Sequence, residues 1–186
     1  MFNKKITQEA QLRLRSLIGQ QFSFVGGVNL PDYLVSDSLI VETSSTSVSI
    51  YGDTEEQALG QGSSDDFAFF VIGDVSDKEL ETIHKSGNMY LLDKRSRITD
   101  IFVIRDFVSV VSENVTKWQL EWDSALVIGL ETGFVAISFL SLGAEALRVD
   151  FLDELALEML PLPSSGYENS LLKQYNSRRE IVSLGK

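Results

Sequence analysis

The chain has 186 residues, of which 44% are hydrophobic and 23% charged, so it is long and apolar enough for a globular domain and is not globally disordered. It carries 27 acidic and 16 basic residues, a formal net charge of -11, and such a surface repels nucleic-acid phosphates and anionic membranes. It contains no cysteine, which excludes disulfides, thiolate nucleophiles and cysteine-based zinc sites.

The same features predict a cytoplasmic protein. No apolar run approaches the ~18 residues that span a bilayer. Two lysines stand near the N-terminus, but no apolar segment of a secretory signal follows them. The absence of cysteine fits a reducing compartment.

The first predicted elements are a helix and a strand. Thr7 can cap a helix over residues 8–18, in which apolar side chains recur at helical spacing, and Gly19 stands at its expected end. After it, Phe22 and Phe24 alternate with polar residues, as in a strand.

Residues 39–43 and 47–51 predict a hairpin, and the apolar run 67–72 predicts a buried strand. Between them, residues 52–66 are acidic and rich in glycine and serine. This composition is typical of a loop, so we expect the least regular structure here.

The second helix has the clearest start signal. Ser76 and Glu79 form a capping box, flanked by the apolar pair Val75 and Leu80, and Gly87 ends the helix. Strands are then expected over 89–92 and 98–103, around a charged turn at 93–97. A further strand at 107–111 ends in a turn at 112–114.

The stretch 118–151 predicts a three-strand meander that forms the core of the fold. Trp118, Leu120 and Trp122 alternate with polar residues, and the apolar run 125–130 ends at a turn that contains Gly133. Strands over 134–140 and 147–151 complete the meander. Beyond it, residues 155–163 have no clear assignment, a short third helix is expected after Ser165, and a last strand is expected over 180–184.

Together these elements predict one α+β domain over residues 1–186, with an antiparallel sheet meander and two or three helices on one face. Residues 39–50 and 126–137 have apolar residues at matching positions, and each follows an Asp-Ser pair. This pattern suggests two related halves, 1–75 and 76–186. The alternative is that any two amphipathic hairpins look alike at this level.

No catalytic, cofactor or metal signature is present. His84 is the only histidine and sits at the edge of an apolar helix stripe, and no nucleophile elbow frames any serine. The glycine-rich residues 60–64 lack the lysine and following helix of a phosphate loop, and the acidic loop around them lacks the register of a calcium loop. We therefore expect a non-enzymatic protein without a cofactor or metal.

Acidic side chains form two groups, which we expect to bind a basic protein partner. The first group comprises Asp53, Glu55, Glu56, Asp65 and Asp66. The second comprises Glu131, Asp150, Asp153 and Glu154. Their expected role is to present negative charge to lysine and arginine.

The acidic composition, the absence of cysteine, the helix-then-sheet order and strands such as 126–138 resemble small bacterial immunity proteins, the antidotes of polymorphic or contact-dependent toxins. The resemblance implies a toxin inhibitor that covers the basic site of an enzyme such as a nuclease with carboxylates. Two alternatives stay open. One is an assembly subunit, a homodimer joined through sheet edges. The other is a hydrolase that uses carboxylates and a metal.

Overall fold

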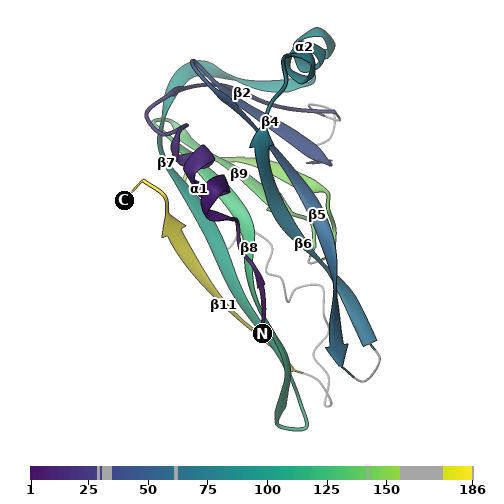
Figure 1. Cartoon of the computed structure of the whole chain (residues 1–186). Coiled ribbons are helices and arrows are strands. Elements are labelled where there is room, and N and C mark those ends of the chain that lie inside the picture. The colour runs from purple at the N-terminus through teal and green to yellow at the C-terminus, as the bar shows by residue number, and fades with distance from the viewer. Residues whose placement is uncertain (29, 31–34, 61–62, 142, 156–173, 186) are drawn as a thin grey trace.

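Strands make up most of the molecule, shown in Figure 1 as a computed structural model. The structure describes residues 1–28, 30, 35–60, 63–141, 143–155 and 174–185. In this part of the chain there are two helices, α1 (Gln8–Arg15) and α2 (Asp77–Ser86). The predicted α+β class is therefore wrong, and the protein is mostly β.

Eleven strands form one sheet in the described part of the chain. They are β1 (Phe2–Lys4), β2 (Gln21–Gly27), β3 (Val35–Ser36), β4 (Ser38–Thr43), β5 (Ser47–Gly60), β6 (Ser63–Asp74), β7 (Met89–Ser112), β8 (Val115–Leu130), β9 (Gly133–Phe139), β10 (Leu147–Leu152) and β11 (Gln174–Ser183). The order is β3-β10-β9-β8-β7-β2-β4-β5-β6, and β1 and β11 pair with β8 and β7 respectively. Every pairing is antiparallel except that of β1 with β8.

The long strand β7 joins two layers of this sheet. Its first part, Met89 to Arg97, pairs with β2, and its second part, from Ile98 onward, pairs with β8 and β11. We call β2, β4, β5 and β6 the first layer, and β8, β9 and β10 with the second part of β7 the second layer. Since β3 pairs with β10 and leads into β4 after one residue, the far edge of the second layer returns to the first.

The main core lies between the two layers. Phe70 of the first layer packs against Phe139 of the second with ring centroids 4.2 Å apart, and Trp122 stacks on Phe139 at 5.6 Å. The Trp122 Nε1–H donates a 2.6 Å hydrogen bond to the Ala68 carbonyl oxygen, which joins β8 to β6. Trp122 and Phe139 lie in the predicted meander, which the structure confirms as strands β8, β9 and β10.

The two helices contact opposite faces of the first layer. Ala10 and Leu14 of α1 belong to the core cluster that contains Val25 and Val41, whereas Ile83 of α2 packs with the residues that point the other way from the same strands, Phe24 and Ile40. Successive side chains of a strand alternate between its faces. The expectation that all helices cover one face is therefore wrong.

Both predicted helix starts are confirmed. The Thr7 hydroxyl accepts a hydrogen bond from the Ala10 amide at 3.1 Å, and Ser76 and Glu79 make the predicted capping box. Gly87 ends α2 with φ of 70°. The end of α1 falls at Arg15, earlier than predicted, and turns follow it up to Gly19, whose φ is 84°.

The prediction that residues 52–66 form a loop is wrong, because the described residues of this stretch, 52–60 and 63–66, belong to the strands β5 and β6. These two strands pair in one ladder from Val48 with Asp74 to Gly60 with Ser63. The apolar run Phe67 to Phe70 in β6 is opposite the acidic part of β5, from Gly52 to Glu55. Three residues of this run, Phe67, Ala68 and Phe70, are buried, and they supply the packing that the composition of β5 lacks.

The predicted turn at 93–97 is also wrong, since β7 continues through it. Ser96 and Arg97 pair with Phe22 and Gln21, and the register shifts between Phe22 and Phe24. The predicted turn at 112–114 is confirmed, with positive φ at Glu113 and Asn114. The last strand begins earlier than predicted, at Gln174.

The expected third helix and residues 156–163 lie outside the described residues. The duplication of 1–75 and 76–186 stays a prediction.

Candidate functional site

The structure brings the first acidic group together on one hairpin. Residues 47–60 and 63–74 of β5 and β6 carry Asp53, Glu55, Glu56, Asp65 and Asp66, and all five side chains are exposed. We call these strands the acidic hairpin. Figure 1 shows it running to the lower right, away from α2 at the top. Glu56 lies opposite Asp66 in the ladder, and Asp65 lies opposite Gln57.

Like charges opposite each other are unfavourable, so the hairpin needs support from elsewhere. One support is Lys4 of β1, which is 8% exposed and forms an ion pair with the Glu55 carboxylate. The Lys4 ammonium also lies 5.2 Å from the ring centroid of Phe69. The hydrogen bond and charge of Lys4 lower the pKa of the Glu55 carboxyl, which keeps it ionised.

The second support is the connection between β9 and β10. Its Glu145 carboxylate accepts a 2.9 Å hydrogen bond from the Thr54 hydroxyl. The backbone of Glu145 also lies so near Gly52 that a Cβ at residue 52 would be 2.1 Å from its carbonyl oxygen. Glu145 therefore adds a sixth carboxylate to this region, which the sequence alone did not indicate because it depends on a contact 91 residues apart.

The second predicted group is on other elements. The Asp150 carboxylate accepts hydrogen bonds from Arg148 at 2.6 and 3.0 Å, which offsets its charge, and Glu131 accepts one from the Arg97 amide at 3.2 Å. Asp153 and Glu154 are exposed just beyond β10. Glu145, which contacts the acidic hairpin, precedes β10, and Asp153 follows it. The six residues of β10 span ~20 Å, so the structure does not join the second group to the acidic hairpin.

The clearest signal for the site is a charge asymmetry in the sequence. Residues 16–77, which contain all four strands of the first layer, hold ten of the 27 acidic residues and none of the 16 basic ones. The rest of the chain has 17 acidic and 16 basic residues and is nearly neutral. Almost all of the net charge of -11 therefore belongs to this one segment.

A pocket of about 360 Å³ lies between α2 and the outer face of β2, β4 and β5. Its apolar wall includes Ile40 and Ile83, and Tyr51 and Thr82 stand among its polar residues. Gly26 also lines it, and a Cβ there would lie 2.6 Å from the Ile83 side chain, so only glycine lets β2 pass this close to α2. The volume is within the range of small ligand sites.

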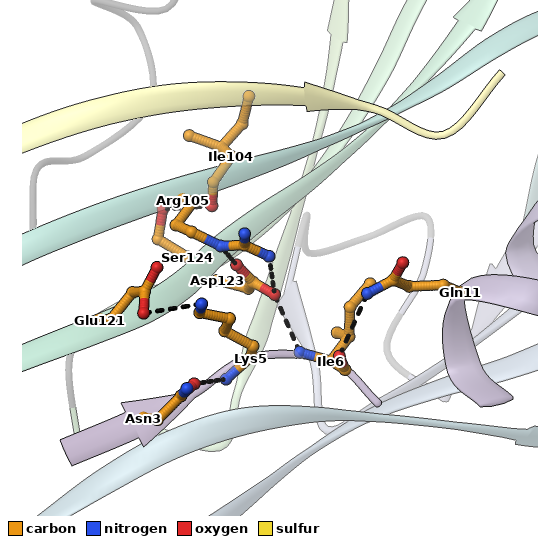
Figure 2. A network of polar contacts seen from close by, with 9 residues as sticks. All are labelled: Asn3, Lys5, Ile6, Gln11, Ile104, Arg105, Glu121, Asp123 and Ser124. Carbon is orange, nitrogen blue, oxygen red and sulfur yellow. Dashed lines mark hydrogen bonds and ion pairs between the residues drawn. The ribbon is translucent and has the colours of Figure 1, made fainter. Parts of the chain in front are cut away.

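Two ion pairs with buried carboxylates link β7 to its neighbours β8 and β11, and the sequence alone indicated neither of them. Figure 2 shows the first, in which Arg105 of β7 donates hydrogen bonds of 2.7 and 3.3 Å to the carboxylate of Asp123 in β8. The same carboxylate accepts a 2.8 Å hydrogen bond from the Ile6 amide. Burial raises the pKa of the Asp123 carboxyl, against the opposing effect of Arg105 and of that amide. In the second pair, Arg179 of β11 binds Asp106 of β7. Both pairs link neighbouring strands, so we assign them to the stability of the fold and not to a functional site.

The described residues contain no arrangement that indicates catalysis. The His84 ring contacts the Glu42 carboxylate at 3.1 Å and meets Phe24 edge-on, with centroids 5.2 Å apart. Among the described residues, no three histidine or acidic side chains lie close enough together to hold a metal ion. In the same part of the chain, neither helix is long and apolar enough to cross a membrane.

No protein-family model, curated protein or solved structure matches the chain.

Proposed function

We propose that this chain is a non-enzymatic, cytoplasmic protein-binding module whose acidic hairpin docks on a basic protein. In its most specific form the proposal is an immunity protein that covers the basic site of a toxin such as a nuclease. One observation carries it: almost all of the net charge of the chain belongs to residues 16–77, and five exposed carboxylates of this segment gather on one hairpin.

Two physical arguments support this function. Concentrated charge of one sign attracts a partner of the other sign and speeds the encounter. Moreover, the contacts with Lys4 and Glu145 hold the hairpin in place, so little conformational entropy is lost when a partner binds.

The test compares two variants of equal net charge. Asp53→Asn with Asp66→Asn removes two charges from the acidic hairpin. Glu81→Gln with Glu113→Gln removes two exposed charges from α2 and the β7–β8 turn, outside residues 16–77. Each variant is used as bait in native lysate of the source cell at low and high salt, and the affinity of any captured basic protein is then measured by calorimetry.

We expect the hairpin variant to bind the captured protein at least about tenfold more weakly at low salt, with a smaller dependence on salt, and the control variant to bind as wild type does. Equal affinity of both variants and wild type would refute acidic docking. For the immunity proposal, the captured protein must also be a toxin whose activity the wild-type chain inhibits.

Self-association through a sheet edge is a second candidate, favoured by the pairing of β5. β4 accompanies β5 only as far as Tyr51, and beyond that residue β6 is the sole paired neighbour of β5 among the described strands. Exposed edges accept strands from other chains. Light scattering of the purified protein tests this candidate: a tight, salt-insensitive dimer supports it, and a monomer at high concentration excludes it.

A further inference from the structure

The pocket between α2 and the first layer opens beside the acidic hairpin. Ser49 and Tyr51 line the pocket, and Asp53 and Glu55 are the next two members of the same alternating row along β5. At the far end of this row, Glu55 contacts Lys4 of β1. Successive members of such a row are about 7 Å apart. An apolar recess and two carboxylates therefore follow one another along a single strand.

The edge of this pocket carries exposed apolar and aromatic side chains, as binding surfaces do. Tyr51 is 39% exposed and Val28 is 67% exposed, and both line the pocket. Large apolar or aromatic side chains that accept a partner's anchor residue account for much of the affinity of protein interfaces. Nearby charges then steer and orient the partner.

We infer that this pocket receives an apolar side chain of an extended segment of the partner, and that the same segment places basic side chains on Asp53 and Glu55. The inference rests on the proposed function and specifies the partner's chemistry: one apolar anchor, with lysine or arginine two and four positions away. This spacing follows from the row on β5, since an extended segment that runs along it has the same repeat.

The charges of the site favour this occupant over an acidic or neutral one. Among the described residues that line the pocket, Lys78 on α2 is the one basic residue, and the strands of the pocket wall belong to the segment without lysine or arginine. The Glu55 side chain keeps 58% of its surface exposed despite its contact with Lys4, so a second cation can reach it.

The test uses short blocked peptides of serine and glycine with one tryptophan and with arginine two and four positions from it, made in both sequence orders. A second set replaces the tryptophan by serine, and a third replaces both arginines by serine. Binding at low salt is measured by calorimetry, and the contact surface is mapped by changes in the backbone amide NMR signals.

Two protein variants locate the anchor. Thr82→Phe fills the pocket from an exposed position of α2, and Thr116→Phe adds the same ring at an exposed position of β8 outside the pocket. Their amide spectra show whether each variant is folded. If Thr82→Phe is not folded, Tyr51→Ser, which removes an exposed ring from the edge of the pocket, replaces it.

We expect a peptide with tryptophan to bind at least about tenfold more tightly than its serine counterpart, and to shift the amide signals of Gly26, Gly27 and Thr82. Thr82→Phe should abolish this difference, and Thr116→Phe should preserve it. The inference is overturned if no peptide binds, if tryptophan and serine peptides bind alike, or if Thr82→Phe leaves the difference intact.

The peptides without arginine separate this inference from the proposed function. If affinity depends on arginine but not on tryptophan, acidic docking stands and the anchor pocket fails. If tryptophan peptides bind equally well with and without arginine, the pocket stands as an apolar site, and acidic docking and the basic spacing of the segment both fail.

Discussion

The Asp106 carboxylate has no exposed surface and accepts two hydrogen bonds of 2.8 Å from the Arg179 guanidinium. These residues are opposite each other in the ladder between β7 and β11. The ion pair therefore fixes the last strand of the chain to the strand that joins the two layers.

Arg179→Met should destabilise the protein by about 3–5 kcal/mol, because it leaves a buried carboxylate without its cation. The measurement is the free energy of unfolding in urea at pH 7. The double variant Asp106→Leu with Arg179→Met removes both charges and should recover more than half of that loss. A single variant as stable as wild type would contradict the assignment.

Gly52→Ala tests the contact between the acidic hairpin and the β9–β10 connection. The added methyl group would meet the backbone carbonyl of Glu145 at 2.1 Å, and that backbone can yield only by moving the β9–β10 connection. We expect a loss of about 1–3 kcal/mol in the free energy of unfolding.

Gly73→Ala is the matched control for Gly52→Ala. Its methyl group would meet only the Ser49 hydroxyl, at 2.9 Å, and a hydroxyl can rotate away. The control should therefore lose less stability than Gly52→Ala in the same denaturation experiment. The reverse order would show that the β9–β10 connection does not hold the hairpin.

Trp122→Phe should lower the free energy of unfolding by about 1–3 kcal/mol, because the buried carbonyl of Ala68 loses its donor while most of the aromatic packing remains. Trp118→Phe is the control, since Trp118 is only partly buried and contacts Phe67 edge-on. Urea denaturation followed by circular dichroism measures both variants. A larger loss in the control would show that the Trp122 hydrogen bond is not a main link between the layers.

The capping box of α2 predicts a pH dependence of stability. The Ser76 hydroxyl and amide donate hydrogen bonds to the Glu79 carboxylate and lower its pKa below the ordinary value of 4.5. An acid whose pKa is lower in the folded state contributes stability above its unfolded pKa and loses it as the pH falls through the folded pKa.

Glu79→Ala should therefore be less stable than wild type at pH 7, and this difference should shrink as the pH falls below 4.5. Thermal unfolding at pH 7, 5, 4 and 3 measures it. Ser76→Ala, which removes the hydroxyl cap itself, should cost about 1 kcal/mol at pH 7. A difference between Glu79→Ala and wild type that does not change with pH would contradict the role of the charged carboxylate.

The sequence alone determined the features that depend on near neighbours. Thr7, Ser76 and Gly87 marked helix ends correctly because caps involve residues within one turn. The meander of β8, β9 and β10 was predictable because alternation and the turn at Gly133 are local signals. The charge asymmetry of residues 16–77 was also present in the sequence, and a count of charges by segment would have found it.

Only the tertiary structure decided the fold class, the support of the acidic hairpin and the pocket. Residues 52–58 look like a loop by composition, and they form a strand because β6 supplies the apolar partners. In addition, Lys4 pairs with the Glu55 carboxylate, and the Thr54 hydroxyl donates a hydrogen bond to Glu145. Asp106 and Arg179 are ordinary charges in the sequence, and Asp106 is buried against Arg179 because residues 73 positions apart lie on neighbouring strands. Such pairings are set by burial and by contacts between distant segments, and no short stretch of sequence contains both partners.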